Sequence, residues 1–165
     1  MKIYTKSGDK MQTTTFKGRV YKDDLVIEVE GTLDEATTTL AFAKANNSDE
    51  EICKILNDLI NKMFAFGSEF LGYTKDKITS DDVSELEKII DEYSLKMEKN
   101  NDFIVPGQNV RSASIHLARV TIRRLERRIV RYYRENSMDG NNILLQFINR
   151  LSDLLFTLGK WEDLR

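Results

Sequence analysis

The sequence predicts an all-α protein, a bundle of five helices, and three observations lead to this fold class. The 165 residues contain a single proline, Pro106, and only 8 glycines, so long stretches carry no residue that breaks a helix. Hydrophobic residues make up 41% of the chain, which suits a protein that buries a core. Within five stretches they recur every three or four positions, the period of an amphipathic helix.

The first two helices are expected over residues 25–45 and about 52–70. The apolar face of the first consists of Val26, Val29, Leu33, Ala36, Leu40 and Ala43. That of the second consists of Ile52, Ile55, Leu56, Leu59, Met63, Phe66 and Phe70. Gly31 lies inside the first helix and costs about 1 kcal/mol relative to alanine, so packing must compensate for it.

Three further helices are expected. Hydroxyl and acidic residues at 79–82 are typical of a helix N-terminus and precede the third, which reaches about residue 97. Residues 100–109 hold the proline and are expected to form a loop. The fourth helix is expected over about 110–135 and the fifth after Gly140. Their apolar faces are Ile115, Ala118, Ile122, Leu125 and Ile129, and Leu144, Ile148, Leu151, Leu155 and Leu158.

Residues 1–22 show neither helical nor strand periodicity and are expected to form a polar loop punctuated by glycines. Glycines, lysines and hydroxyl side chains in one loop can surround phosphate groups, and Asp9 could meet a metal ion. The loop lacks the G-x-x-x-x-G-K-[ST] pattern of a Walker A motif. A frayed terminus is the alternative interpretation.

Several classes of function are excluded by composition. Cys53 and His116 are the only cysteine and histidine, so Ser-His-Asp, Cys-His and multi-histidine zinc sites lack partners. No apolar run approaches the roughly 20 residues of a membrane span, and the N-terminus lacks a signal core. With a net charge of −2, the chain does not offer the positive field of a nonspecific nucleic-acid binder. One cytoplasmic domain, residues 1–165, is expected, without a membrane or nucleic-acid partner.

The fourth helix carries a row of arginines. Arg119, Arg123 and Arg127 are four positions apart, so a helix aligns them on one face, with Glu126 nearby. Guanidinium groups suit phosphate oxygens, but a solvated or ion-paired face is the more usual origin of a charge run, and the spacing alone does not decide between them. Acids of residues 31–35 could pair with this helix or form an exposed turn.

Six blocks, read together, resemble the PduO-type ATP:cob(I)alamin adenosyltransferases. They are residues 4–10 (YTKSGDK), 31–35 (GTLDE), 103–107 (FIVPG), 116–119 (HLAR), 123–127 (RRLER) and 149–153 (NRLSD). Their order and spacing match the family over nearly the whole chain.

The resemblance implies a ferritin-like five-helix bundle, typical of cobalamin adenosyltransferases, in which residues 1–22 wrap phosphate and residues 23–165 form the helices. It implies a homotrimer that binds ATP with Mg²⁺ between subunits and cobalamin beside it. The reaction would transfer the 5′-deoxyadenosyl group of ATP to Co(I) and release triphosphate. A reductase and an adenosylcobalamin-dependent enzyme are further implied partners.

The family's site residues carry over position by position. The nucleotide contacts would be Thr5, Lys6, Ser7, Gly8, Asp9, Thr13, Lys22, Arg123, Arg124, Glu126 and Asn149, while no residue is assigned as a protein metal ligand. Arg123, Phe103 and Lys6 would be catalytic, Phe103 and Pro106 would contact the corrinoid, and Asp34 and Arg119 would link subunits. Arg127 and Arg128 are then expected to be solvated.

This chemistry suits the composition, because the nucleophile is the cobalt of the substrate and no Ser, Cys or His base is needed. The chain departs from the family pattern at Met11 and Gln108, where glycines are usual. A helical bundle that binds ATP or corrinoid without turnover, as a carrier or regulator, is the alternative function.

Overall fold

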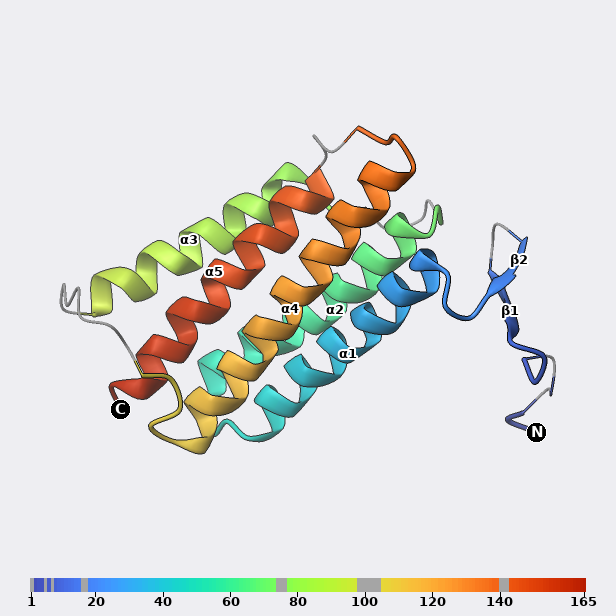
Figure 1. Ribbon diagram of the computed structural model, residues 1–165. Coiled ribbons are helices and arrows are strands. Elements are labelled where there is room, and N and C mark those ends of the chain that lie inside the picture. The colour runs from blue at the N-terminus through green and yellow to red at the C-terminus, as the bar shows by residue number, and fades with distance from the viewer. Residues whose placement is uncertain are drawn as a thin grey trace.

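The computed structural model describes residues 2–4, 6, 8–15, 18–73, 77–97, 105–139 and 143–165. It contains the five expected helices: α1 (Leu25–Ala45), α2 (Glu50–Phe70), α3 (Ser80–Lys96), α4 (Val110–Glu135) and α5 (Ile143–Asp163). Figure 1 shows them running side by side along one long axis. The prediction of an all-α bundle is therefore confirmed, and α1 and α4 have the expected bounds. None of the described helices combines the length and apolar character that crossing a bilayer requires.

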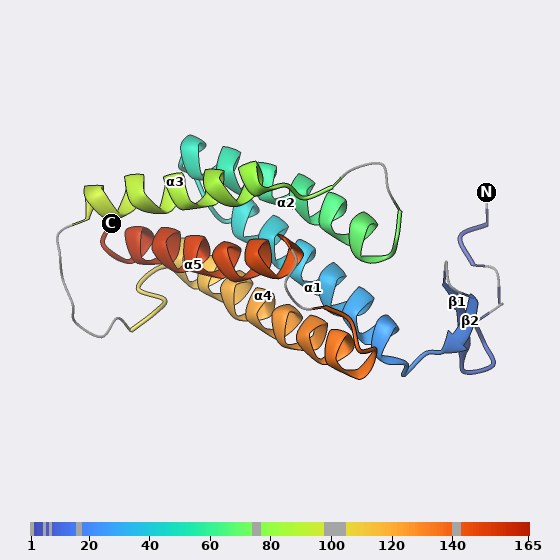
Figure 2. The same cartoon turned by 90° about the horizontal axis from the view of Figure 1, so that it is seen from above.

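Helices α4 and α5 form the centre of the bundle. They pack extensively against each other, while α1 packs on α4 and α3 packs on α5. Helix α2 lies against α1, and Figure 2 shows α2 and α3 on the side of the bundle away from α4. The arginine row therefore belongs to a helix with neighbours on two sides, so its members meet different surroundings.

The expected apolar faces form the core. Ile115, Ala118, Ile122, Leu125 and Ile129 of α4 are all fully buried, as are the five expected positions of α5 apart from Leu144, which is nearly so. In α1 the packing includes Val29, Ala36, Leu40 and Ala43, so it surrounds the helix that contains Gly31. This packing supplies the compensation that the sequence requires.

Replacing Leu125 with alanine is expected to lower the free energy of unfolding by about 3 kcal/mol. Leu125 is fully buried on α4, so truncation removes apolar contacts and leaves a cavity. Val120→Ala is the matched control, since Val120 lies on the same helix with 47% of its surface exposed, and its effect should stay within about 0.5 kcal/mol. Urea denaturation followed by circular dichroism measures both. Equal losses would contradict this description of the core.

Side-chain caps fix where two of the helices begin. Thr79 accepts a hydrogen bond from the Asp82 backbone N–H, and the Asp82 carboxylate accepts one from the Thr79 N–H, which makes a capping box. Asn109 and Ser112 form the equivalent box before α4. The expected start of the third helix is thus confirmed, whereas the cap at Asn109 was not anticipated.

The N-terminal segment differs from the expected loop, because it contains a β-hairpin. Strand β1 (Gln12–Thr15) pairs antiparallel with β2 (Gly18–Tyr21), and Thr13 lies opposite Val20. β-branched threonines favour a strand. The hairpin lies beyond the end of the bundle where α1 begins (Figure 1), so neither of its faces is covered by a core. Alternation of apolar and polar residues was therefore absent from its sequence.

Candidate functional site

The predicted nucleotide contacts fall into two groups within one chain. Lys6, Gly8, Asp9, Thr13 and Lys22 belong to the N-terminal segment, while the second group lies on α4 and α5. Thr5, Ser7 and Phe103 lie outside the described residues. The first described group therefore precedes the helical bundle, and the second lies within it.

Arg119 and Arg123 are neighbouring cations of the α4 row, and neither has an acidic partner within the described part of the chain. Arg123 is exposed, and Arg119 is half-buried with its guanidinium 5.8 Å from the centre of the Phe156 ring. The Arg119 Nε atom is buried, and no described residue forms a hydrogen bond with it. Burial and the neighbouring Arg123 charge together lower the pKa of Arg119. Two adjacent, uncompensated guanidinium groups form a surface that favours an anion.

Arg124 and Arg128, in contrast, pair with acids of α1. Arg124 forms an ion pair with Glu35, and Arg128 pairs with Glu28 at 3.0 Å and donates to the hydroxyl of Thr32. The expectation that Arg128 is solvated is therefore wrong, because α1 packs against this side of α4. The expectation that acids of residues 31–35 pair with the fourth helix is confirmed by Glu35.

The Arg124–Glu35 pair is exposed to solvent, with 45% and 54% of the two side chains accessible. Exposed ion pairs contribute little free energy, on the order of 0–1 kcal/mol. A polyphosphate could therefore displace Glu35 from Arg124 at small cost. Arg124 is held near Arg123 while remaining available to an anion.

Glu126 and Asn149 join the two central helices. The Asn149 amide Nδ2 of α5 donates to Glu126 Oε1 of α4 over 3.0 Å. Since Glu126 lies one turn beyond Arg123, this contact places an amide and a carboxylate beside the arginines. Such groups can bind hydroxyl and amino substituents of a nucleoside, because the amide donates and accepts and the carboxylate accepts.

The N-terminal group forms a turn around a glycine. The Lys22 Nζ atom would lie 3.2 Å from a Cβ added to Gly8, so glycine lets this ammonium group approach the backbone closely. The Lys22 N–H donates to the Met11 carbonyl over 2.9 Å, which ties the turn to the end of the hairpin. Lys6 and Asp9 are exposed beside it. Backbone and ammonium groups in such a turn can bind phosphate oxygens.

Met11 occupies a left-handed backbone conformation, with φ of 60°. This is the position at which the sequence departs from the G-D-x-G pattern of the resembled family. The backbone therefore adopts the conformation that a glycine favours, and for methionine this conformation is less favourable by about 1 kcal/mol.

Replacing Met11 with glycine is expected to stabilise the N-terminal turn by about 1 kcal/mol. The Lys22 amide, which donates to the Met11 carbonyl, should then exchange its hydrogen about fivefold more slowly. Hydrogen-exchange mass spectrometry compares the variant with Gln12→Gly, whose strand position gains nothing from glycine. Faster exchange in Met11→Gly than in the unmodified chain would contradict the assigned strain.

The two groups do not meet within the chain. Arg123 precedes the end of α4 by twelve positions, which is about 18 Å along the helix axis, while the hairpin lies beyond that end of the bundle (Figure 1). Thr15 and Val20 of the hairpin share a recess with Tyr132 and Glu135, at the end of α4 and away from Arg123. Within one chain, the predicted nucleotide contacts therefore lie in two separate places.

Asp34 and Arg119 also stay apart in the described structure. Asp34 is exposed and lines a shallow recess between α1 and α2, whereas Arg119 contacts Phe156 of α5. The following residue, Glu35, is the one that faces α4. Because successive helical residues point about 100° apart, Asp34 is turned away from α4 of its own chain.

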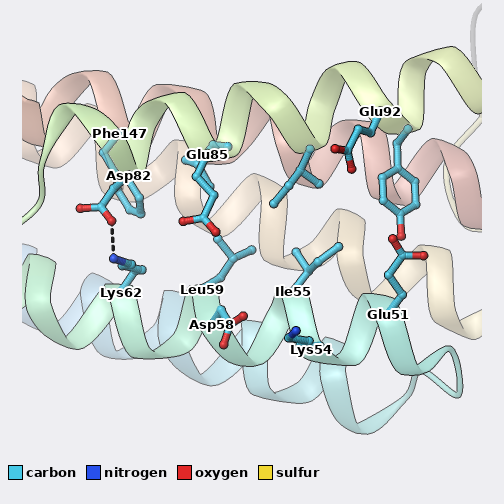
Figure 3. Close-up of a pocket in the computed structure, with 13 residues that line it drawn as sticks. Glu51, Lys54, Ile55, Asp58, Leu59, Lys62, Asp82, Glu85, Glu92 and Phe147 are labelled. Carbon is cyan, nitrogen blue, oxygen red and sulfur yellow. Dashed lines mark hydrogen bonds and ion pairs between the residues drawn. The ribbon is translucent and has the colours of Figure 1, made fainter.

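A separate recess of about 270 Å³ lies between α2 and α3 and contains none of the predicted site residues. Its floor includes Leu59 and Phe147, and acidic side chains such as Glu85 and Glu92 line its rim. Figure 3 shows Lys62 of α2 pointing at Asp82 of α3, where the two form an ion pair across the recess. This recess and the predicted chemistry are thus in different places.

Sequence reasoning missed the aromatic neighbour of the arginine row. Phe156 has 44% of its surface exposed and contacts both Arg119 and His116. It lies off the apolar face that contains Leu151, Leu155 and Leu158. An aromatic residue on the polar face of a predicted helix is the signal that could have identified it.

Comparisons with known proteins identify the family of the chain. The family model described as cobalamin adenosyltransferase matches residues 3–162. The corrinoid adenosyltransferase of Citrobacter freundii is 33% identical over 98% of this chain and 95% of its own length. That of Bacillus subtilis is 35% identical over 100% of this chain and 88% of its own. The chain spans 50% of the length of the corrinoid adenosyltransferase PduO of Salmonella typhimurium.

A solved structure shares the fold closely. It is a variant of the PduO-type ATP:corrinoid adenosyltransferase from Lactobacillus reuteri, complexed with cobalamin and ATP. The TM-score is 0.90 at 30% identity, and the match covers 99% of this chain and 91% of the other.

Proposed function

Because the chain belongs to the cobalamin adenosyltransferase family, we propose that it transfers the 5′-deoxyadenosyl group of ATP to the Co(I) centre of a reduced corrinoid. The observation that carries the proposal is the unpaired Arg119–Arg123 surface, next to the Glu126–Asn149 contact, on a chain that matches this family from residue 3 to residue 162. Cobalamin is the corrinoid that we propose, and the products are adenosylcobalamin and triphosphate.

The reaction requires little covalent chemistry from the protein. The electron pair of Co(I) forms a bond to the ribose C5′ atom, and the C5′–O bond breaks so that its electrons leave with triphosphate. The enzyme orients the two substrates and stabilises the charge that gathers on the leaving triphosphate. The exposed guanidinium of Arg123 and the ammonium groups of Lys6 and Lys22 are suited to this second task.

We propose Thr5, Lys6, Ser7, Gly8, Asp9, Thr13 and Lys22 as the triphosphate-binding segment, with Arg123, Arg124, Glu126 and Asn149 opposite. Phe103 and Pro106 are proposed on the corrinoid side. A hydrophobic side chain at position 103 would keep the lower axial ligand off cobalt and remove its electron donation. Reduction of Co(II) to Co(I) would then become easier.

Mg²⁺ is proposed to enter with ATP. In the described part of the chain, no three His, Cys, Asp or Glu side chains gather as a metal site. Mg²⁺ commonly uses one or two carboxylates together with substrate phosphates and water, and Asp9 beside Lys22 fits that requirement. The ion would neutralise part of the charge that develops on triphosphate.

A homotrimer is proposed because each chain carries two halves of a site that do not meet. Hairpin residues of one subunit would face α4 and α5 of the next, and Asp34 would pair with Arg119 across the same boundary. The exposed Asp34 and the unpartnered Nε atom of Arg119 support this pairing. A cytoplasmic location is proposed as well, with a reductase and an adenosylcobalamin-dependent enzyme as partners.

The test is a turnover assay with purified protein, ATP, Mg²⁺ and chemically reduced cobalamin. The expected result is the absorbance of the light-sensitive adenosylated product, together with one triphosphate for each product formed. Binding of both substrates without any product would instead identify a carrier or regulator.

A further inference from the structure

Two consecutive acids, Glu162 and Asp163, end α5 inside the protein rather than on its surface. Acidic residues at a helix C-terminus face the partial negative charge of the helix dipole, so they need compensation. Glu162 is fully buried and accepts hydrogen bonds from Arg111 Nε over 2.7 Å and from Asn47 Nδ2 over 3.1 Å. The side chain of Asp163 is only 3% exposed.

The two oxygens of Asp163 have separate partners. Oδ1 accepts the backbone N–H of Gly107 over 3.1 Å and that of Gln108 over 3.0 Å, while Oδ2 lies 3.0 Å from Nε2 of His116. Burial raises the pKa of Asp163, but the bonds from Ser112, Gln108, His116 and Gly107 together lower it below its usual value. The carboxylate is therefore the natural acceptor at the centre of this cluster.

The segment held by Asp163 has a constrained path. Gly107 has a φ of 95°, a conformation that other residues rarely adopt, and Asn109 donates to the Glu162 carbonyl over 2.6 Å. Both ends of the 107–109 stretch are thus fixed to the last turn of α5. The exposed Pro106 immediately precedes them.

The position of the His116 ring, which contacts the Asp163 carboxylate, is fixed by its neighbours. Its ring packs on Gly159, where an added Cβ would lie 2.6 Å from a ring carbon, so the imidazole has no room to move toward α5. The Nδ1 atom has no partner in the described part of the chain, which leaves Asp163 as the contact that orients the ring. The ring also neighbours Phe156, which contacts Arg119.

From this geometry we infer that Asp163, together with His116, is a positioning residue for corrinoid binding: it holds residues 107–109 and so directs the chain that carries Pro106. The inference rests on the proposed function, in which this segment faces the corrinoid. A role limited to folding would affect both substrates alike. A positioning role affects the corrinoid and spares ATP, whose proposed contacts lie elsewhere on the chain.

The test compares Asp163→Ala with Asp163→Asn. Alanine removes every acceptor, and we expect KM for cob(I)alamin to rise about tenfold or more while KM for ATP changes less than about twofold. Asparagine should restore most of the affinity, because its Oδ1 can accept both N–H groups and its Nδ2 can donate to His116 Nε2. Asp91→Ala, which removes an exposed acid of α3, is the matched control and should leave both KM values unchanged.

An independent readout is the electron paramagnetic resonance spectrum of cob(II)alamin bound with ATP, which reports axial coordination of cobalt. In Asp163→Ala we expect more of the bound cob(II)alamin to keep its lower ligand, with recovery in Asp163→Asn. Unchanged corrinoid KM and spectrum in Asp163→Ala, or equal increases of both KM values, would overturn the inference.

The unmodified protein provides a check that does not depend on how the variants fold. The Gly107 and Gln108 amides should be protected from hydrogen exchange, and exchange at the rate of an open chain would overturn the inference. An unmodified protein that makes no adenosylated product would refute the proposed function instead. An active protein with a normal Asp163→Ala variant would refute only the positioning role.

Discussion

Replacing Arg123 with alanine is expected to slow adenosyl transfer by on the order of 10²-fold or more. Its guanidinium is exposed on α4, lacks an acidic partner in the described structure and adjoins the half-buried charge of Arg119. Charge that develops on triphosphate would be stabilised by this group more strongly in the transition state than in the ground state. The loss should therefore appear in kcat as well as in kcat/KM.

The matched control is Arg131→Ala, which lies two turns further along α4. Arg131 pairs with Glu135 on the surface, so its removal should change activity little and stability by at most about 0.5 kcal/mol. Single-turnover kinetics and circular dichroism measure both variants. Full activity of Arg123→Ala would show that this residue is not part of the triphosphate site. If Arg123→Ala loses its helical circular dichroism signal, Arg123→Lys, which keeps the charge, is compared with the unmodified protein instead.

Mixing two inactive variants is expected to restore activity if the site is shared between subunits. Lys6→Ala disables the half of the site in the N-terminal segment, and Arg123→Ala disables the half on α4. When equal amounts are co-expressed and assemble at random, about a quarter of the boundaries in a closed ring receive both unmodified halves. The whole mixture, purified through one tag common to both variants, should then show about a quarter of normal activity.

The control for this experiment is the double variant mixed with the unmodified chain in equal amounts. A shared site again leaves about a quarter of normal activity, whereas a site within one chain leaves about half. A mixture of the single variants that stays inactive, with about half the activity in this control, would refute the shared site. In that case the N-terminal segment would have to reach Arg123 of its own chain when the substrates bind.

Prediction from sequence was most successful for the helices. The apolar faces of α4 and α5 are set by side chains three or four positions apart, and this period is a local property that needs no knowledge of the fold. The hairpin was not predicted from the sequence, because its strands are short and do not cover a core. The start of α3 could be predicted from the neighbouring residues of its capping box at Thr79. No such local pattern indicated the contacts made at the end of α5.

By itself the sequence determined the five-helix bundle and, through six blocks in order, the family to which the chain belongs. Only the tertiary structure decided which arginines are free, because the choice depends on which side of α4 is covered by α1: Arg124 and Arg128 meet Glu35 and Glu28, and Arg123 does not. It also brought Asp163 to Gly107, 56 positions away. Local periodicity fixes a helix, whereas contacts between distant segments depend on how the helices pack.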